Sequence, residues 1–190
     1  MALASQNQQF IRKTFELAKL GEGKVSPNPL VGAVIVKNGK ILATGYHESF
    51  GSAHAERAAI LKLAKKKPIK NCALGTTLYV SLEPCNHYGK TPPCTDIIIE
   101  AGIKRVYFGV HDPHPLVAKN NSLKILRIAG VEVFGPVLEQ EAKLLNRIFL
   151  KNVLRQEPYY ILKTAQSQDR RMISVLTTST CGYHSTMMFG

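Results

Sequence analysis

The amino-acid sequence predicts an α/β sandwich in which a mixed, mainly parallel central sheet is opened by a β-hairpin. Apolar strand-like runs alternate with helical runs along most of the chain, and Asn38-Gly39 separates the first two strand-like runs. Of the 190 residues, 45% are hydrophobic and 20% are charged, which is typical of a globular domain with a buried core. One ordinary domain with a short appendage accounts for this length.

The first half of the chain contains the signals for the hairpin and for a central strand. The expected elements are a helix at residues 7–20, strands at 30–36 and 41–47, a helix at 54–64 and a strand at 76–82. Asn-Gly between two apolar runs predicts a two-residue hairpin turn, because both turn positions need positive φ. Gly21 and Gly23 end the first helix, and the last strand is apolar enough to be covered on both faces.

The second half continues the alternation and then changes character near its end. The expected elements are a helix at 95–101, a strand at 105–110, a helix at 122–129, a strand at 131–134 and a helix at 138–154, whose buried stripe has Leu144, Leu145, Ile148 and Phe149. Residues 159–163 form one more strand. Residues 167–190 show no sustained period and offer that strand nothing to pair with, so we expect them to be mobile or loosely packed. The unpaired strand could instead pair with a second chain, which would make a homo-oligomer.

His54, Cys85 and Cys94 carry the clearest chemical signal. The chain has four cysteines, too few and too irregularly spaced for a disulfide scaffold, so metal binding or catalysis is the first expectation. One imidazole and two thiolates form a three-ligand zinc set that leaves the fourth tetrahedral position for water. We expect all three ligands near the junctions of strands and helices, where helix N-termini favour thiolates over thiols.

Glu56, two residues after His54, is the candidate for proton transfer. Zinc lowers the pKa of bound water toward about 7, and a carboxylate that is not a ligand can take the proton and return it to a leaving amine. The pattern H-x-E followed by P-C-x-x-C is the signature of zinc deaminases. Here eight residues separate Cys85 from Cys94, instead of two. The sequence predicts a hydrolytic deaminase with one zinc ion per chain.

Three segments carry a longer match. They are residues 26–34 (SPNPLVGAV), 54–56 (HAE) and 82–94 (LEPCNHYGKTPPC). Together they closely resemble the deaminase domain of the bifunctional deaminase-reductases of riboflavin biosynthesis, and the likeness runs from about residue 8 to 165. The resemblance implies a three-layer α/β/α, cytidine-deaminase-like fold. It also implies removal of the ring amine of 2,5-diamino-6-ribosylamino-4(3H)-pyrimidinone 5′-phosphate, with release of ammonia.

The resemblance gives the three zinc ligands and the proton-transferring glutamate the roles stated above. The substrate contacts that it implies are Asn28, His47, Ala55, Lys90 and Asp112. Asn28 and His47 match the positions that read the base, and Lys90 matches a phosphate-binding lysine, whose point charge suits a 5′-phosphate. Taken alone, Asn28 would be a turn residue, His47 a strand-end histidine and Lys90 a solvated loop residue.

Departures from the family pattern bear on the substrate and on the domain organisation. His114 stands where the family usually has asparagine, and Lys119-Asn120-Asn121 stands where a glycine-rich turn is expected. Residues 164–171 lack the leucine and glycine of the segment that opens the NADPH-dependent reductase domain. We therefore expect a deaminase domain at residues 1–157, a truncated and divergent reductase remnant at residues 158–190, and no NADPH.

The net charge of +12 leaves the class of partner open. The densest basic run, Lys65-Lys66-Lys67, falls at an expected helix end, where lysines complement the helix dipole, so a solvated terminus is favoured over a binding patch. We expect a small pyrimidine nucleotide as the partner and no nucleic acid, whose stacking needs aromatic side chains; the chain has no tryptophan. A nucleic-acid deaminase and a catalytically degenerate domain stabilised by zinc are the alternative hypotheses. No apolar run is long enough for a membrane helix and no secretory signal is recognised, so we expect a cytoplasmic protein.

Overall fold

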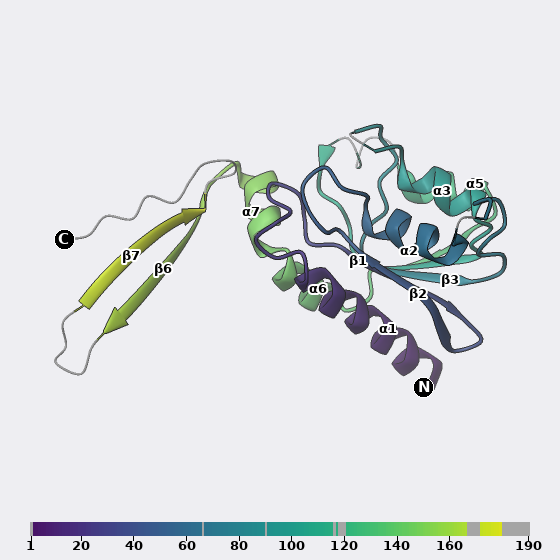
Figure 1. Ribbon diagram of the computed structural model, residues 1–190, viewed down its shortest axis with the longest axis horizontal. Helices are drawn as coiled ribbons and strands as arrows, with labels where there is room; N and C mark the ends of the chain where they lie inside the picture. The colour runs from purple at the N-terminus through teal and green to yellow at the C-terminus, as the bar shows by residue number, and fades with distance from the viewer. Residues whose placement is uncertain are drawn as a thin grey trace.

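The computed structural model describes residues 2–65, 67–89, 91–115, 117, 121–166 and 172–179. A five-stranded sheet lies between two layers of helices, and a separate two-stranded sheet lies at the C-terminal end (Figure 1). The elements are α1 (Ala2–Lys19), β1 (Gly32–Lys37), β2 (Lys40–Tyr46), α2 (Ala55–Ala64), β3 (Thr77–Leu82), α3 (Cys94–Glu100), β4 (Arg105–Val110), α5 (Ser122–Ile128), β5 (Glu132–Phe134), α6 (Glu139–Leu145), α7 (Arg147–Arg155), β6 (Tyr159–Gln166) and β7 (Met172–Ser179).

The central sheet has the strand order β2-β1-β3-β4-β5. Strand β1 is antiparallel to both β2 and β3, whereas β3, β4 and β5 are parallel, so four strands share one direction and only β1 opposes them. Asn38 and Gly39 form the turn between β1 and β2 with φ values of 50° and 74°, as a two-residue hairpin requires. The predicted mixed, mainly parallel sheet with an opening hairpin is confirmed.

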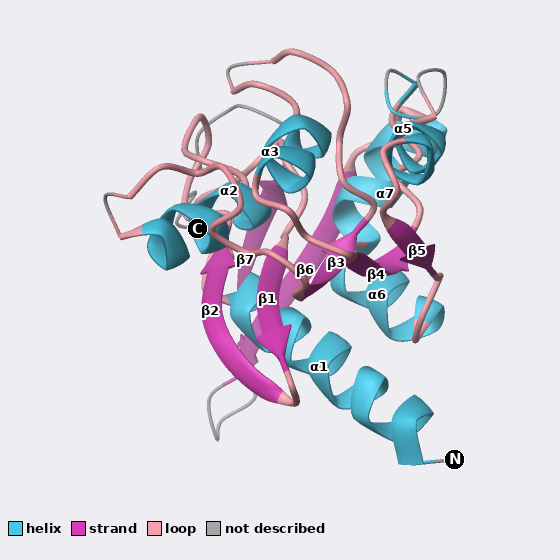
Figure 2. Ribbon diagram, turned by 90° about the vertical axis from the view of Figure 1, so that its right-hand side faces the viewer, coloured by secondary structure: helices cyan, strands magenta, loops and turns pink. Residues whose placement is uncertain are grey.

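Helices cover both faces of this sheet (Figure 2). On one face α1 packs so closely on β1 that a Cβ atom at Gly32 would overlap the carbonyl oxygen of Thr14. On the other face α2 packs on β2, where a Cβ atom at Gly45 would overlap the carbonyl oxygen of Ala55. Both glycines therefore set the spacing of the layers, and the second one brings the first turn of α2 against the sheet.

The single helix expected at residues 138–154 is two helices, α6 and α7, which meet at Asn146. Asn146 is only 2% exposed, and its side chain bonds the backbone of Leu30: Leu30 N donates to Oδ1 at 2.8 Å, and Nδ2 donates to Leu30 O at 2.9 Å. The backbone of Asn146 leaves the helical conformation, at φ −103°, where its side chain bonds a residue 116 positions earlier in the chain. The expected buried stripe is correspondingly incomplete, because Leu144 is 65% exposed.

The strand at the C-terminal end has a partner within the chain. Strands β6 and β7 pair in antiparallel register from Tyr159↔Ser179 to Gln166↔Met172. Our expectation that nothing after this strand could pair with it was wrong for residues 172–179. A hairpin needs only two extended segments of β-forming residues, and β7 has the β-branched sequence for this without any sustained alternation. Residues 167–171 and 180–190 lie outside the described residues.

Among the described residues, no helix is both long enough and apolar enough to cross a membrane.

Candidate metal centre

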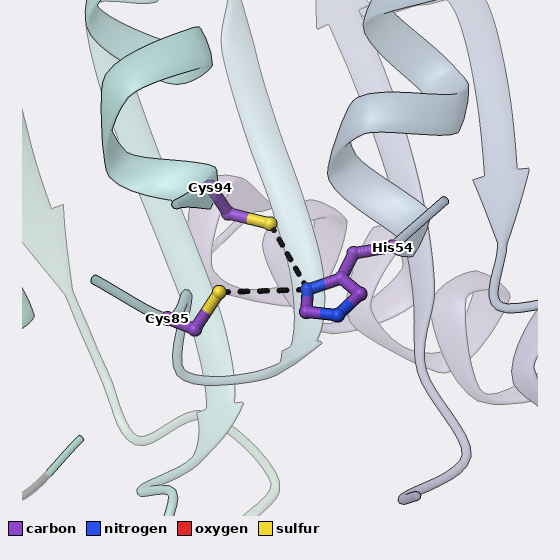
Figure 3. A group of neighbouring side chains, drawn as sticks. All are labelled: His54, Cys85 and Cys94. Carbon is purple, nitrogen blue, oxygen red and sulfur yellow. Dashed lines mark hydrogen bonds between the residues drawn. The ribbon is translucent and has the colours of Figure 1, made fainter. Parts of the chain in front are cut away.

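Three elements bring the predicted zinc ligands together. His54 directly precedes α2 in an extended conformation, Cys85 lies in the loop that follows β3, and Cys94 is the first residue of α3. Nδ1 of His54 lies 3.4 Å from Sγ of Cys85 and 3.4 Å from Sγ of Cys94 (Figure 3). The three ligand atoms all lie within 4.8 Å of one another.

The geometry of these donors fits a tetrahedral zinc ion. Zinc–sulfur bonds of about 2.3 Å and zinc–nitrogen bonds of about 2.0 Å, at a tetrahedral angle, separate sulfur from nitrogen by about 3.5 Å. The measured separations of 3.4 Å match this value. Both cysteines are buried, so a metal at this point would be held in the interior of the domain.

Charge at the centre is concentrated on Cys85. The hydrogen bond from Cys94, and after it the one from His54, lower the pKa of the Cys85 thiol to about 4 despite its burial. The same shared proton raises the pKa of Cys94, and the hydrogen bond with Cys85 raises the pKa of His54. Zinc binds thiolates and a neutral imidazole, so metal binding would release the protons that these three ligands still carry.

Glu56 lies in the first turn of α2, beside the metal ligands. Its side chain is only 3% exposed. Burial, and next the negative charge of Cys85, raise the pKa of Glu56 from 4.5 to about 7. A carboxyl group with this pKa can both accept and donate a proton near neutral pH, which is what a general acid–base group needs.

A cavity of about 170 Å³ opens at the centre. Its walls include the ligands His54 and Cys85 and several of the predicted contacts, and the lining residues are Asn28, Pro29, Val31, His47, His54, Glu56, Leu82, Glu83, Cys85, His87, Asp112, His114 and Phe149. We call this cavity the zinc cleft. Of the five expected substrate contacts, Asn28, His47 and Asp112 line it. The side chain of Ala55 is buried outside the cleft, so Ala55 could contribute only through its backbone, and Lys90 lies outside the described residues.

Asn28 and His47, expected to read a base, are hydrogen-bonded to each other. Nδ2 of Asn28 lies 3.0 Å from Nε2 of His47, and Nδ1 of His47 lies 3.2 Å from the carbonyl oxygen of Ala53. A carbonyl only accepts, so Nδ1 carries the proton and Nε2 accepts from the Asn28 amide. Burial lowers the pKa of His47, which agrees with this neutral tautomer. The pair therefore presents a fixed orientation of the Asn28 amide to the zinc cleft.

One of the departures from the family pattern, His114, lies in the wall of the zinc cleft. Its ring stacks on that of His87 with 5.8 Å between the centroids. Asp112 accepts a hydrogen bond from His114 N at 2.9 Å, and burial raises the pKa of the Asp112 carboxyl. Asn121 adopts a left-handed conformation at φ 48° and caps α5 by accepting from Lys124 N, a conformation that asparagine tolerates in place of glycine. Residues 119 and 120 lie outside the described residues.

Glu83 is a charged residue of the zinc cleft that was not among the site residues predicted from the sequence. Both of its carboxylate oxygens accept hydrogen bonds, from His111 and from Ser122. The only signal in the sequence was an acidic residue directly after a buried strand and before Pro84, a position where an unpaired charge would be costly.

Comparison with known proteins supports a zinc-binding site in this chain. The sequence model of the cytidine and deoxycytidylate deaminase zinc-binding region matches residues 4–110, and the chain belongs to this family of zinc-dependent deaminases. It is 48% identical over 163 residues to the riboflavin biosynthesis protein RibD of Actinobacillus pleuropneumoniae, a match that covers 86% of this chain and 42% of that protein. It is 44% identical over 173 residues to RibD of Aquifex aeolicus, covering 91% of this chain and 47% of that protein.

Solved structures agree with these relatives. The diaminohydroxyphosphoribosylaminopyrimidine deaminase/5-amino-6-(5-phosphoribosylamino)uracil reductase of Thermotoga maritima superposes with a TM-score of 0.76 at 47% identity, over 82% of this chain and 43% of that one. The Rib2 deaminase of Aspergillus oryzae, at 24% identity and a TM-score of 0.62, shares the fold. The chain thus spans less than half the length of the RibD relatives named above and matches their deaminase part. The fold class, the resemblance to the riboflavin deaminases and zinc as the cofactor are confirmed.

Proposed function

We propose that this chain catalyses the hydrolytic deamination of 2,5-diamino-6-ribosylamino-4(3H)-pyrimidinone 5′-phosphate. Water is added at the ring carbon, the ring amine leaves as ammonia, and that carbon gains a carbonyl oxygen. The observation that carries the proposal is the buried carboxyl of Glu56 beside the His54–Cys85–Cys94 set at one cleft. Support for the substrate comes from the relatives, because the Thermotoga maritima protein is named for the deamination of this class of compound.

Zinc, Glu56 and the pair of Asn28 and His47 have separate roles in the proposed reaction. Bound zinc would supply Lewis-acid chemistry that makes water acidic at neutral pH. Glu56, with its pKa raised to about 7, takes a proton from the attacking water and delivers a proton to the departing amine. The hydrogen-bonded pair of Asn28 and His47 orients the pyrimidinone ring, because its neutral tautomer fixes which atoms donate and which accept.

The remaining substrate contacts follow from the cleft and from the family resemblance. We place Asp112 against the ribose side of the substrate, the backbone of Ala55 against the ring, and Lys90 against the 5′-phosphate. We also propose that residues 1–157 form the deaminase domain and that residues 158–190 correspond to the start of the reductase part of the relatives. We propose a free nucleotide as the partner rather than nucleic acid, because the Thermotoga maritima relative is named for a free phosphoribosylaminopyrimidine.

Ammonia release from the diaminopyrimidinone nucleotide, measured on the zinc-loaded chain with and without a chelator, tests this proposal. We expect turnover that stops when zinc is removed and returns when zinc is restored. Full zinc occupancy without turnover would overturn the proposal. That result would favour a domain that zinc merely stabilises, an alternative suggested by His114 in the cleft wall. Deamination of transfer RNA with salt-sensitive binding would favour a nucleic-acid deaminase instead.

A further inference from the structure

Glu83 lies between strand β3 and the ligand Cys85, and both of its oxygens are engaged. Oε2 accepts a hydrogen bond from Nδ1 of His111 at 2.7 Å, and Oε1 accepts one from Oγ of Ser122 at 2.5 Å. The side chain is nearly buried and lines the zinc cleft. A carboxylate can accept hydrogen bonds from two donors at once, one at each oxygen.

The two donors stand at the two ends of one segment. His111 is the first residue after β4, and Ser122 is the first residue of α5. Ser122 is fully buried, so its hydroxyl needs the partner that Glu83 supplies. The ring of His111 also packs edge-on against Phe108, with 4.8 Å between the centroids, which fixes the direction of its Nδ1.

The segment between these two donors carries cleft residues. Asp112 and His114 both line the zinc cleft. Within the segment, His114 N donates to Oδ1 of Asp112 at 2.9 Å, and Val117 N donates to the carbonyl oxygen of His114 at 2.9 Å. These local bonds shape the segment. The two bonds to Glu83 join His111 and Ser122 to the chain two residues before Cys85. They act in addition to the stacking of His114 on His87 and the burial of Val117 in the core.

We propose that Glu83 is a positioning residue that holds both ends of the segment from His111 to Ser122 and thereby fixes Asp112 and His114 in the wall of the zinc cleft. The Glu83 carboxylate would then fix the position of Asp112 and His114 relative to the metal ligand Cys85. The kinetic consequence of this proposal rests on the proposed deaminase function, but its structural consequence does not.

Hydrogen exchange of the zinc-loaded full chain tests the structural consequence. In Glu83→Ala, both bonds are lost, because alanine offers no acceptor to His111 or to Ser122. We expect the amides of His114 and Val117 to exchange about tenfold faster or more, the factor that corresponds to losing one hydrogen bond to a charged group. Ser122→Ala should have the same effect. Unchanged exchange at both amides in both variants would overturn the proposal, whether or not the protein is active.

A matched control separates this effect from a general loss of stability. Ser81 is also a fully buried serine whose hydroxyl makes one bond, accepting from Gly32 N at 3.1 Å on β1. Ser81→Ala should not accelerate the exchange of the His114 and Val117 amides more than the exchange of amides in the central sheet. Equal acceleration in Ser81→Ala would show a global effect and would contradict a specific role for Glu83.

Steady-state kinetics on the diaminopyrimidinone nucleotide test the functional consequence. Because Asp112 and His114 are placed at the substrate and away from proton transfer, Glu83→Ala should raise KM about tenfold and change kcat less than about threefold, with zinc content unchanged. The double variant Glu83→Ala/Ser122→Ala should have the same KM as Glu83→Ala, because Ser122→Ala removes a bond that Glu83→Ala has already removed. Loss of zinc together with kcat at constant KM would overturn the proposal. Absence of turnover in the wild type would refute the deaminase function and leave the exchange result to decide on Glu83.

Discussion

Replacing Asn146 by alanine should destabilise the domain strongly, although Asn146 touches neither the metal nor the zinc cleft. Its buried amide makes two hydrogen bonds with the backbone of Leu30, at 2.8 Å and 2.9 Å. Asn146→Ala leaves both the N–H and the carbonyl of Leu30 without this partner, at about 1–3 kcal/mol for each group. The expected loss is therefore about 2–6 kcal/mol in the free energy of unfolding, or roughly 4–24 °C in Tm for a chain of this size.

Urea denaturation followed by circular dichroism measures this loss, and Asn152→Ala is the matched control. Asn152 lies on α7, six residues beyond Asn146, and its buried Oδ1 has no hydrogen-bond partner within the described part of the chain. Its replacement should cost less than about 1 kcal/mol. If Asn146→Ala were no more destabilising than Asn152→Ala, the bonds to Leu30 would not be what breaks the helix between α6 and α7.

Two further predictions concern the metal and pH. Cys94→Ser should reduce bound zinc from about one ion per chain to near zero and lower Tm. Cys72→Ser, outside the ligand set, should leave the zinc content unchanged. Equal zinc content in the two variants, measured by atomic absorption, would refute the ligand assignment. Because burial lowers the pKa of His47 below its ordinary value of 6.5, the unfolded chain binds the proton more readily, so stability should fall as pH drops below 6.5. His47→Gln should flatten this decline in thermal scans between pH 7 and pH 5, and an unaltered slope would contradict a buried neutral His47.

Much of the sheet and the metal centre could be predicted because their signals are local. Asn38-Gly39 fixes a hairpin by its own backbone preference, and β3 and β4 are continuous apolar runs with clear limits. The zinc ligands lie at the ends of such elements, so the predicted elements also placed the ligands at one edge of the sheet. Ligand type and position were therefore readable without long-range information.

The features that could not be predicted depend on contacts between distant residues. Asn146 interrupts a helical pattern because of bonds to Leu30, and no periodicity reveals them. Glu83 is explained by donors 28 and 39 residues further along the chain. Asn28 and His47 were each expected at the base, but their bond to one another depends on a loop conformation that the sequence does not specify.

The buried carboxyl of Glu56 beside the three ligands is the centre of the proposed chemistry, and its replacement by glutamine tests that chemistry most directly. Glutamine keeps the size of the side chain but cannot carry a proton between water and amine. Ammonia release and zinc content should be measured together on zinc-loaded wild type and Glu56→Gln. We predict one zinc ion in both proteins and a loss of turnover of about 10²-fold or more in Glu56→Gln. Full activity in a zinc-loaded Glu56→Gln protein would contradict the proposed role of Glu56.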